Sequence, residues 1–314
     1  MPAKAGFASL ASGLFCFDVM KRFFALFFSL LLWSSGFAQA SQKCDAGSGC
    51  IEQDSWQIGI AMGLGGRTNP LVDGDTIPFI LLPDIAWYGE SAYFDNGELG
   101  YQWLPGPRTS VELFVVPNFE KANFSFWHVS NLLVPAASFL NTSTTPPFQS
   151  IGDQQDAEPE DRRLSVDDID TRKWAFDAGI RYQWYLDNHH VRLMMARDIS
   201  SVYDGFHAAL EYRYYTHFGD WQVTVASQLA WKGQALTDYY YGIRPRDAAN
   251  QSLYYEGKGG FQPAINVNAS YQINKKWHVL TRLGVTQLHE GMTDSPVVED
   301  STVYSAFAGV AYRF

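Results

Sequence analysis

The chain has 314 residues and a net charge of -10, with 16% aromatic residues and only 18% charged ones. Its mean hydropathy of -0.16 excludes a polytopic helical membrane protein, which needs apolar runs of about 20 residues. The aromatic content excludes a disordered chain. The acidic balance argues against nucleic acid as a partner, because proteins bind nucleic acids by neutralising phosphates.

Residues 1–40 are predicted to be a secretory signal peptide. A basic start at 20–22 precedes the apolar run at 23–33, and Ala38 and Ala40 occupy the small-residue positions of a cleavage site. The segment upstream of Met20 fits this pattern badly, so we expect translation to start at Met20.

Cleavage after Ala40 leaves a short periplasmic tail at 41–54. Cys44 and Cys50 lie in this tail with five residues between them. Because an exported chain meets an oxidising compartment, they are predicted to form a small disulfide loop.

From residue 55 to the C-terminus, apolar and polar residues alternate with a period of two, which indicates β-strands. In the segment 220–231, for example, Trp221 and Val223 lie on one face, and Gln222 and Thr224 lie on the other. The pattern predicts twelve strands, at 55–65, 76–88, 91–104, 108–118, 121–133, 172–186, 189–199, 203–217, 220–231, 259–272, 276–288 and 301–314. The fourth and fifth are the weakest, which leaves ten strands as an alternative.

Alternation alone fits both a soluble β-sandwich and a transmembrane β-barrel. Aromatic residues at both ends of strands, as at Trp174 and Trp184, match the two interfacial girdles of a membrane barrel. Strands of about ten residues are long enough to cross a bilayer when tilted. Short turns alternate with long polar loops at 134–171, 232–257 and 289–300, as in outer-membrane barrels. We therefore predict an all-β fold, a closed antiparallel transmembrane barrel over 55–314, in contact with outer-membrane lipid and lipopolysaccharide.

The last strand carries its apolar residues on one face and ends on a terminal aromatic residue. This ending resembles the C-terminal signal by which the outer-membrane assembly machinery recognises barrels. Tyr312 and Phe314 are the residues that would form such a signal.

Several segments, in order, resemble the MipA/OmpV family of outer-membrane proteins. The longest is IPFILLPDIAWYGESAYFDNGELGYQWL at 77–104, and shorter ones follow at 170–173, 240–243, 295–298 and 312–314. The resemblance implies an outer-membrane β-barrel. It further implies a scaffold that links a lytic transglycosylase to a peptidoglycan synthase, although other members are described as osmoregulated or adhesive surface proteins.

The polar face of the predicted strands supplies the candidate lumen lining. These side chains would either line a solute path or pair across the lumen, and a barrel of twelve strands lies between a filled interior and an open channel. The candidates are Asp177, Arg181, Arg192, Asp198, His207, Glu211, Arg213, His278 and Arg282.

Three other patterns are interpreted as structural. The glycine-rich segment 63–68 lacks the lysine of a phosphate-binding loop, and we interpret it as the end of a barrel strand. The acidic segment 153–170 lacks the spacing of a calcium loop and is interpreted as a solvated outer loop. No spacing ties the histidines to a nucleophile, so we expect no catalytic residues, no metal and no cofactor.

The leading hypothesis is therefore a scaffold or structural protein of the cell envelope that is not an enzyme. A narrow channel for small solutes is the alternative. An outer-membrane hydrolase is the second alternative.

Overall fold

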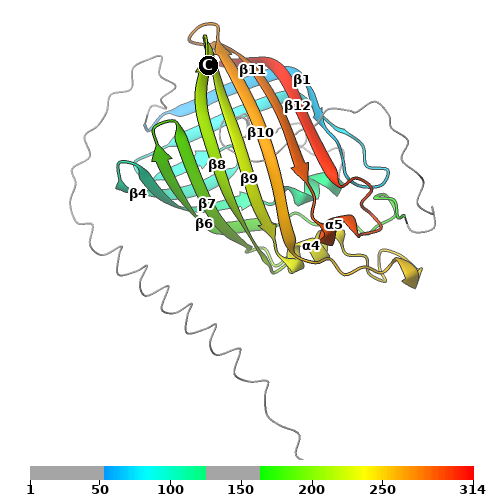
Figure 1. Cartoon of the computed structure of the whole chain (residues 1–314). Coiled ribbons are helices and arrows are strands. Elements are labelled where there is room, and N and C mark those ends of the chain that lie inside the picture. Colours follow the sequence, from blue (N-terminus) through cyan, green and yellow to red (C-terminus); the bar gives the residue numbers. More distant parts are fainter. Residues whose placement is uncertain (1–52, 125–162) are drawn as a thin grey trace, which may run out of the picture. The chain divides into compact units, whose positions relative to one another are not determined.

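The computed structural model describes residues 53–124 and 163–314, which form a closed antiparallel barrel of twelve strands (Figure 1). Each strand pairs with its neighbours in sequence, and β1 pairs with β12 to close the ring, from Gly59 opposite Arg313 to Arg67 opposite Ser305. The strands are β1 (Trp56–Arg67), β2 (Ile77–Tyr88), β3 (Ala92–Asp95), β4 (Glu98–Gly106), β5 (Thr109–Pro117), β6 (Phe176–Leu186), β7 (His189–Asp198), β8 (Phe206–Phe218), β9 (Trp221–Lys232), β10 (Gly260–Gln272), β11 (Trp277–Gln287) and β12 (Thr302–Arg313).

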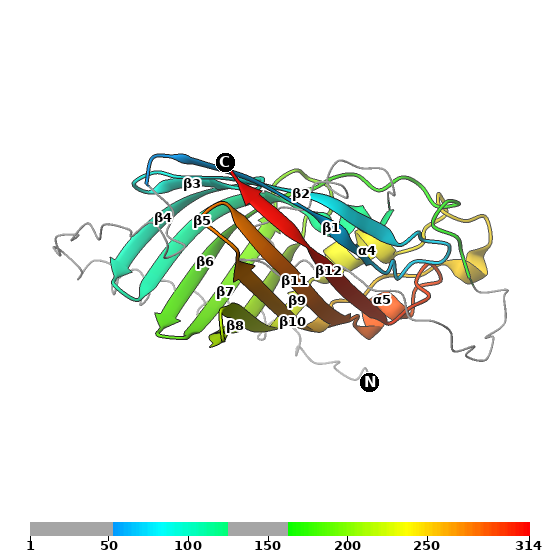
Figure 2. The same cartoon turned by 90° about the horizontal axis from the view of Figure 1, so that it is seen from above.

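Short helices lie between the strands at one end of the barrel. They are the 3-10 helices η1 (Phe119–Phe124) and η3 (Gln251–Leu253) and the α-helices α4 (Gln234–Tyr241) and α5 (Glu290–Thr293). Figure 1 and Figure 2 both place α4 and α5 at the end opposite the C-terminus. In the ranges 53–124 and 163–314, no helix has the length and apolar character needed to span a bilayer.

The faces of the strands decide between the two architectures that alternation allows. On β8, the apolar side chain of Leu210 is 49% exposed, whereas its neighbour Glu211 is 2% exposed. Leu229 on β9 is likewise exposed, and Arg213 on β8 is buried. A soluble sandwich would bury the apolar face, so this inverted arrangement is that of a transmembrane barrel, with apolar residues toward lipid and polar residues toward the lumen.

Aromatic rings gather at both ends of the strands. The rings of Phe206 and Trp231 lie 4.8 Å apart at the end where α4 begins, and those of Trp221 and Tyr271 lie 5.4 Å apart at the opposite end. Amphipathic rings at these two levels match the two interfaces of a membrane. Outer-membrane barrels carry their long loops outside and their short turns in the periplasm, so we call the α4 end the outer end.

The predicted number of twelve strands is confirmed, but two of the predicted segments are wrong. The segment 91–104 is a hairpin of two strands, β3 and β4, because Asn96 and Gly97 both adopt positive φ, of 49° and 96°. Asn-Gly is the favoured pair for such a two-residue turn. The segment 121–133 begins in η1, and its part from 125 onward lies outside the described residues.

The glycine-rich segment belongs to β1, as predicted, and it makes room for an aromatic ring. A Cβ added at Gly63, Gly65 or Gly309 would lie 2.7, 2.9 or 2.7 Å from the ring of Phe307. This ring is 2% exposed and packs inside the barrel with Phe79 and with other apolar side chains of β1 and β2. The lumen is therefore filled with apolar side chains on the β1–β2–β12 side.

Candidate functional site

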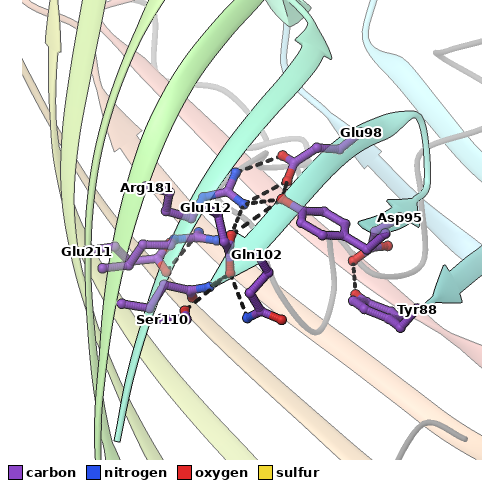
Figure 3. A network of polar contacts seen from close by, with 11 residues as sticks. Tyr88, Asp95, Glu98, Gln102, Ser110, Glu112, Arg181 and Glu211 are labelled. Atoms are coloured by element: carbon purple, nitrogen blue, oxygen red, sulfur yellow. Dashed lines mark hydrogen bonds and ion pairs between the residues drawn. The ribbon is translucent and has the colours of Figure 1, made fainter. Parts of the chain in front are cut away.

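A network of charged side chains joins the neighbouring strands β4, β5 and β6 on the lumen side of the barrel wall (Figure 3). The guanidinium of Arg181 lies 2.7 Å from a carboxylate oxygen of Glu98 and 2.9 Å from one of Glu112, and the three side chains are 7%, 14% and 5% exposed. The hydroxyl of Tyr93 donates a hydrogen bond of 2.7 Å to Glu98. Two carboxylates thus share one guanidinium through charge-assisted hydrogen bonds, which fix its geometry.

The β3–β4 hairpin positions this network. Its tight turn at Asn96 and Gly97 brings Tyr93 and Glu98 close together on adjacent strands. A Cβ at Gly100 would overlap the ring of Tyr93, so this position needs glycine. The segment that resembles the family motif therefore builds one wall of the ion-pair network.

A second set of ion pairs continues the network across β7 and β8. An oxygen of Glu211 lies 3.0 Å from the guanidinium of Arg192, and the guanidinium of Arg213 contacts the same oxygen. Gln183, opposite Arg192 in the β6–β7 ladder, donates a hydrogen bond to Glu112. We refer to Arg181, Glu98, Glu112, Arg192, Glu211 and Arg213 together as the lumen belt.

Asp177 lies nearer the outer end and gathers three polar side chains. Its carboxylate accepts hydrogen bonds from the hydroxyl of Tyr203 at 2.6 Å and from the amide of Asn118 at 2.7 Å, and it lies 2.9 Å from Nε2 of His207. Tyr203 belongs to the loop after β7, and Asn118 directly precedes η1. Asp177 therefore fastens two outer loops to the barrel wall.

The structure places the remaining predicted lumen residues on the inward face as well. Arg282 is buried, and its guanidinium lies 3.3 Å from the side-chain oxygen of Asn266. Asp198 is buried and accepts hydrogen bonds from backbone amides of the loop that follows it, whereas His278 is half-buried. That these groups line a solute path stays a prediction.

The described parts of the outer loops fold together into a unit that we call the cap. It comprises residues 68–76, 118–124, 163–175, 199–205, 233–259 and 288–301 and includes η1, α4 and α5. Its buried apolar side chains form one cluster with Val303 at the start of β12. These cap side chains are Leu71, Leu164, Ala175, Tyr203, Leu236, Tyr240, Tyr241, Ile243, Leu253, Leu288, Met292, Val297 and Val298.

Arg172 is the central polar residue of the cap. Its guanidinium donates hydrogen bonds to Asp247 at 2.7 Å and to the backbone oxygens of Tyr240 at 3.2 Å and Gly242 at 2.9 Å. The last carbonyls of a helix have no partner within the helix, so Arg172 satisfies the end of α4. Burial would raise the pKa of Asp247, but the hydrogen bond and charge of Arg172, together with backbone amides, hold it below its usual range.

Three of the motifs that resemble the family meet in this cap. Arg172 belongs to the segment 170–173, and it binds the segment 240–243. The hydroxyl of Ser295, from the segment 295–298, donates a hydrogen bond to the backbone oxygen of Tyr241. These motifs thus specify the outer closure of the barrel.

Glu120 ties η1 to the barrel and to α4. Nζ of Lys232 lies 2.6 Å from its carboxylate, and the hydroxyl of Tyr241 donates a hydrogen bond of 2.7 Å to it. Asn123 in turn donates to the hydroxyl of Tyr241 at 3.0 Å. Burial alone would raise the pKa of Glu120, but the charge and hydrogen bond of Lys232 and the hydrogen bond of Tyr241 lower it to about 2.

Sequence reasoning missed several charged residues that form ion pairs inside the protein, among them Glu98, Glu112, Glu120, Arg172 and Asp247. A signal existed for the first two, because both fall inside predicted strands, where a charge must face the lumen. Arg172 falls at the start of the predicted strand 172–186, but β6 begins only at Phe176. The pattern held no comparable signal for Glu120 and Asp247, since they lie in loops whose conformation is set by tertiary contacts.

Other predicted features are placed as follows. Tyr312 packs between Trp277 and Phe314, with ring centres 5.0 Å apart in both pairs, and Phe314 is 73% exposed at the periplasmic end. Their role in assembly stays a prediction. Cys44, Cys50 and the predicted signal peptide lie outside the described residues.

Part of the acidic segment, 153–162, also lies outside the described residues, and its later acids Asp167, Asp168 and Asp170 are exposed. Among residues 53–124 and 163–314 there is no group of three His, Cys, Asp or Glu side chains arranged to hold a metal.

Comparison with known proteins gives one family and several relatives. The family model described as MltA-interacting protein MipA matches residues 58–314. The chain is 25% identical over 155 residues to the outer membrane protein Omp26La of Vibrio anguillarum, a match that covers 49% of this chain and 60% of that protein. It is 26% identical over 147 residues to the MltA-interacting protein of Escherichia coli K12, covering 46% and 59%. The chain thus spans about 60% of the length of these curated relatives.

Among solved structures, the translocator domain of the autotransporter NalP from Neisseria meningitidis matches with a TM-score of 0.38 and 9% identity, covering 85% of this chain and 90% of that domain.

Two of the curated relatives are named as outer-membrane proteins of Vibrio species, and the barrel turns its apolar face outward. The chain is therefore a protein of the Gram-negative outer membrane.

Proposed function

The chain belongs to the MltA-interacting protein MipA family, and from this membership we propose that it is a scaffold of the outer membrane that holds murein-remodelling enzymes at its periplasmic face. The resemblance to the family noted in its motifs is thereby confirmed. One relative is named for its interaction with MltA. The resemblance implies a lytic transglycosylase and a peptidoglycan synthase as the partners.

The observation that carries this proposal is the closed interior of the barrel. The lumen belt consists of ion pairs whose members are paired with one another and buried. Apolar side chains fill the lumen around Phe307, and the cap folds over the outer end. Removing one partner from a buried ion pair costs about 3–5 kcal/mol, so a solute path through the belt would require an expensive rearrangement. These features favour a structural role over conduction.

The periplasmic turns are the surface that a partner would contact. Arg108 and Asp187 extend from neighbouring turns, with side chains 61% and 86% exposed and charged atoms 3.6 Å apart. Asp220 and Lys275 lie in further turns and are also exposed. Because these turns join strands of a closed barrel, a partner would meet a rigid, charged rim. The predicted tail at 41–54 would extend from the same end.

Site-specific photo-crosslinking in intact cells tests the scaffold. A photoreactive residue at Asn188, in a periplasmic turn, should capture a murein hydrolase or synthase, identified by mass spectrometry. The same residue at Gln251, in the outer cap, is the matched control and should capture neither. Capture of no cell-wall enzyme from any of the periplasmic turns would count against the proposal.

A conductance measurement separates the scaffold from the narrow channel. Purified full-length protein in a planar bilayer should give no steady open steps, because the belt and the cap obstruct the lumen. Regular open steps that disappear with a denatured sample would overturn the proposal. The reported relatives are named as outer-membrane or interacting proteins, which supports a role without catalysis.

A further inference from the structure

His289 occupies an unusual position in the cap. It lies between β11 and α5, its side chain is buried, and a Cβ added at Gly260 would lie only 2.5 Å from its Nδ1. Gly260 is the partner of Lys232 in the β9–β10 ladder. The imidazole ring is therefore held over the start of β10, beside the ion pair of Lys232 and Glu120.

Neither ring nitrogen of His289 has a hydrogen-bond partner within the described parts of the chain. A neutral imidazole carries one N–H donor, whereas the protonated ring carries two donors and a positive charge. A buried charge without a partner is costly, so this position suits only the neutral ring. Burial accordingly lowers the pKa of His289, with Glu120 raising it and Lys232 lowering it further.

The charged groups around this ring come from three other elements. Lys232 comes from β9 and Glu120 from η1, and Arg67 at the outer end of β1 interacts electrostatically with Glu120. Tyr241 from α4 binds the same carboxylate, and Glu290, next to the histidine, is exposed to solvent. Protonation of His289 would therefore place three cations around a single buried carboxylate.

We propose that His289 makes the cap acid-sensitive, so that protonation of its imidazole loosens α5 and η1 from the ends of β9 and β10 and opens the outer end of the barrel. The closed cap favours the neutral ring. This preference for the neutral ring stabilises the closed cap fully at pH values above the ordinary histidine pKa of 6.5. The stabilisation decreases as the pH falls below that value, because the open cap then takes up a proton more readily than the closed cap. The proposed opening takes place at the outer end of the barrel, so it does not depend on the periplasmic partners of the proposed function.

Hydrogen exchange on the full-length protein in lipid nanodiscs tests this device. Protection factors, corrected for the intrinsic pH dependence of exchange, are compared at about pH 7.5 and pH 5. Each pKa unit by which the closed cap lowers the pKa of His289 corresponds to about a tenfold change in the ratio of open to closed cap. We expect the protection of η1 and of residues 290–295 to be lower at pH 5 than at pH 7.5, while the barrel strands stay protected.

The variant H289Q keeps a polar side chain that does not titrate, and it should lose this acid response. H217Q, which replaces an exposed histidine near the periplasmic end of β8, is the matched control and should keep it. An acid response that persists in H289Q, or its absence from the unmodified protein, would overturn the proposal. If H289Q fails to assemble, the pKa of His289 is measured by NMR titration of the isotope-labelled, unmodified protein instead. A titration midpoint at or above pH 6.5 would refute the proposal.

Discussion

The sharpest prediction concerns Arg172, because one side chain joins two separate segments of the cap, 163–175 and 233–259. The substitution Arg172→Met keeps much of the aliphatic length and removes the guanidinium. It breaks the 2.7 Å ion pair with Asp247, both side chains of which are at most 1% exposed. It also removes the donors that satisfy the backbone oxygens of Tyr240 and Gly242 at the end of α4.

Breaking a buried ion pair by removing one partner costs about 3–5 kcal/mol, since the other charge remains buried. Asp247 keeps hydrogen bonds from the backbone amides of Asp170 at 3.1 Å and Arg244 at 3.0 Å, which offset part of this loss. We therefore expect the lower end of the range, about 3 kcal/mol in the opening free energy of the cap, or roughly a hundredfold in its opening equilibrium.

Hydrogen exchange of the α4 amides in nanodiscs measures this equilibrium directly. The matched control is Arg246→Met, because Arg246 is 45% exposed and its guanidinium lies 3.8 Å from the same Asp247. Because Arg246 reaches in from the solvent and makes only this long contact with Asp247, the control should change protection only slightly. Equal effects of the two substitutions would refute the central role of Arg172.

Three further predictions concern the barrel itself. Arg181→Met leaves two buried carboxylates without their cation and should lower the free energy of unfolding in urea by about 3–5 kcal/mol, whereas Arg108→Met in an exposed turn should leave it nearly unchanged. Phe307→Ala opens a cavity that the facing glycines cannot fill and should cost about 3–5 kcal/mol, against a much smaller loss for the lipid-facing Phe261→Ala in the same titration. Deletion of Phe314 should reduce the fraction of heat-modifiable, membrane-assembled protein in a pulse-chase experiment, and normal assembly would show that the C-terminal signal has been misread.

Much of the barrel could be predicted from the sequence, because lipid imposes a strict rule on each strand. Every second residue of a lipid-facing strand must be apolar, so β8, with Leu210 outside and Glu211 inside, is identified by its pattern alone. The hairpin of β3 and β4 was missed although Asn96-Gly97 is a strong turn signal. The alternation changes phase at this turn, because Asp95 and Glu98 pair on the same face: the lipid-facing side chains are at even positions before the turn and at odd positions, such as Leu99, after it.

The cap could not be predicted from the pattern, because its contacts join residues far apart in the chain. Arg172 and Asp247 are separated by 75 positions, and Asn123 and Tyr241 by 118. No periodicity relates such pairs, since the loops that carry them have no repeating geometry. The resemblance to a family identified the segments 170–173, 240–243 and 295–298. It did not predict that these segments contact one another.

The separation between the lumen belt and the cap bears on how the protein would serve as a scaffold. A platform for periplasmic enzymes must keep its turns in fixed positions, and the belt supplies this rigidity by joining β4, β5 and β6, and β7 to β8, along the inner wall. The cap is fastened by other groups, chiefly Glu120, Arg172 and Asp177. An event that loosens the cap, such as protonation of His289, therefore leaves the belt and the periplasmic turns in place. Arg181→Met should accordingly weaken capture at the periplasmic face, whereas Arg172→Met should leave that capture intact while it opens the cap.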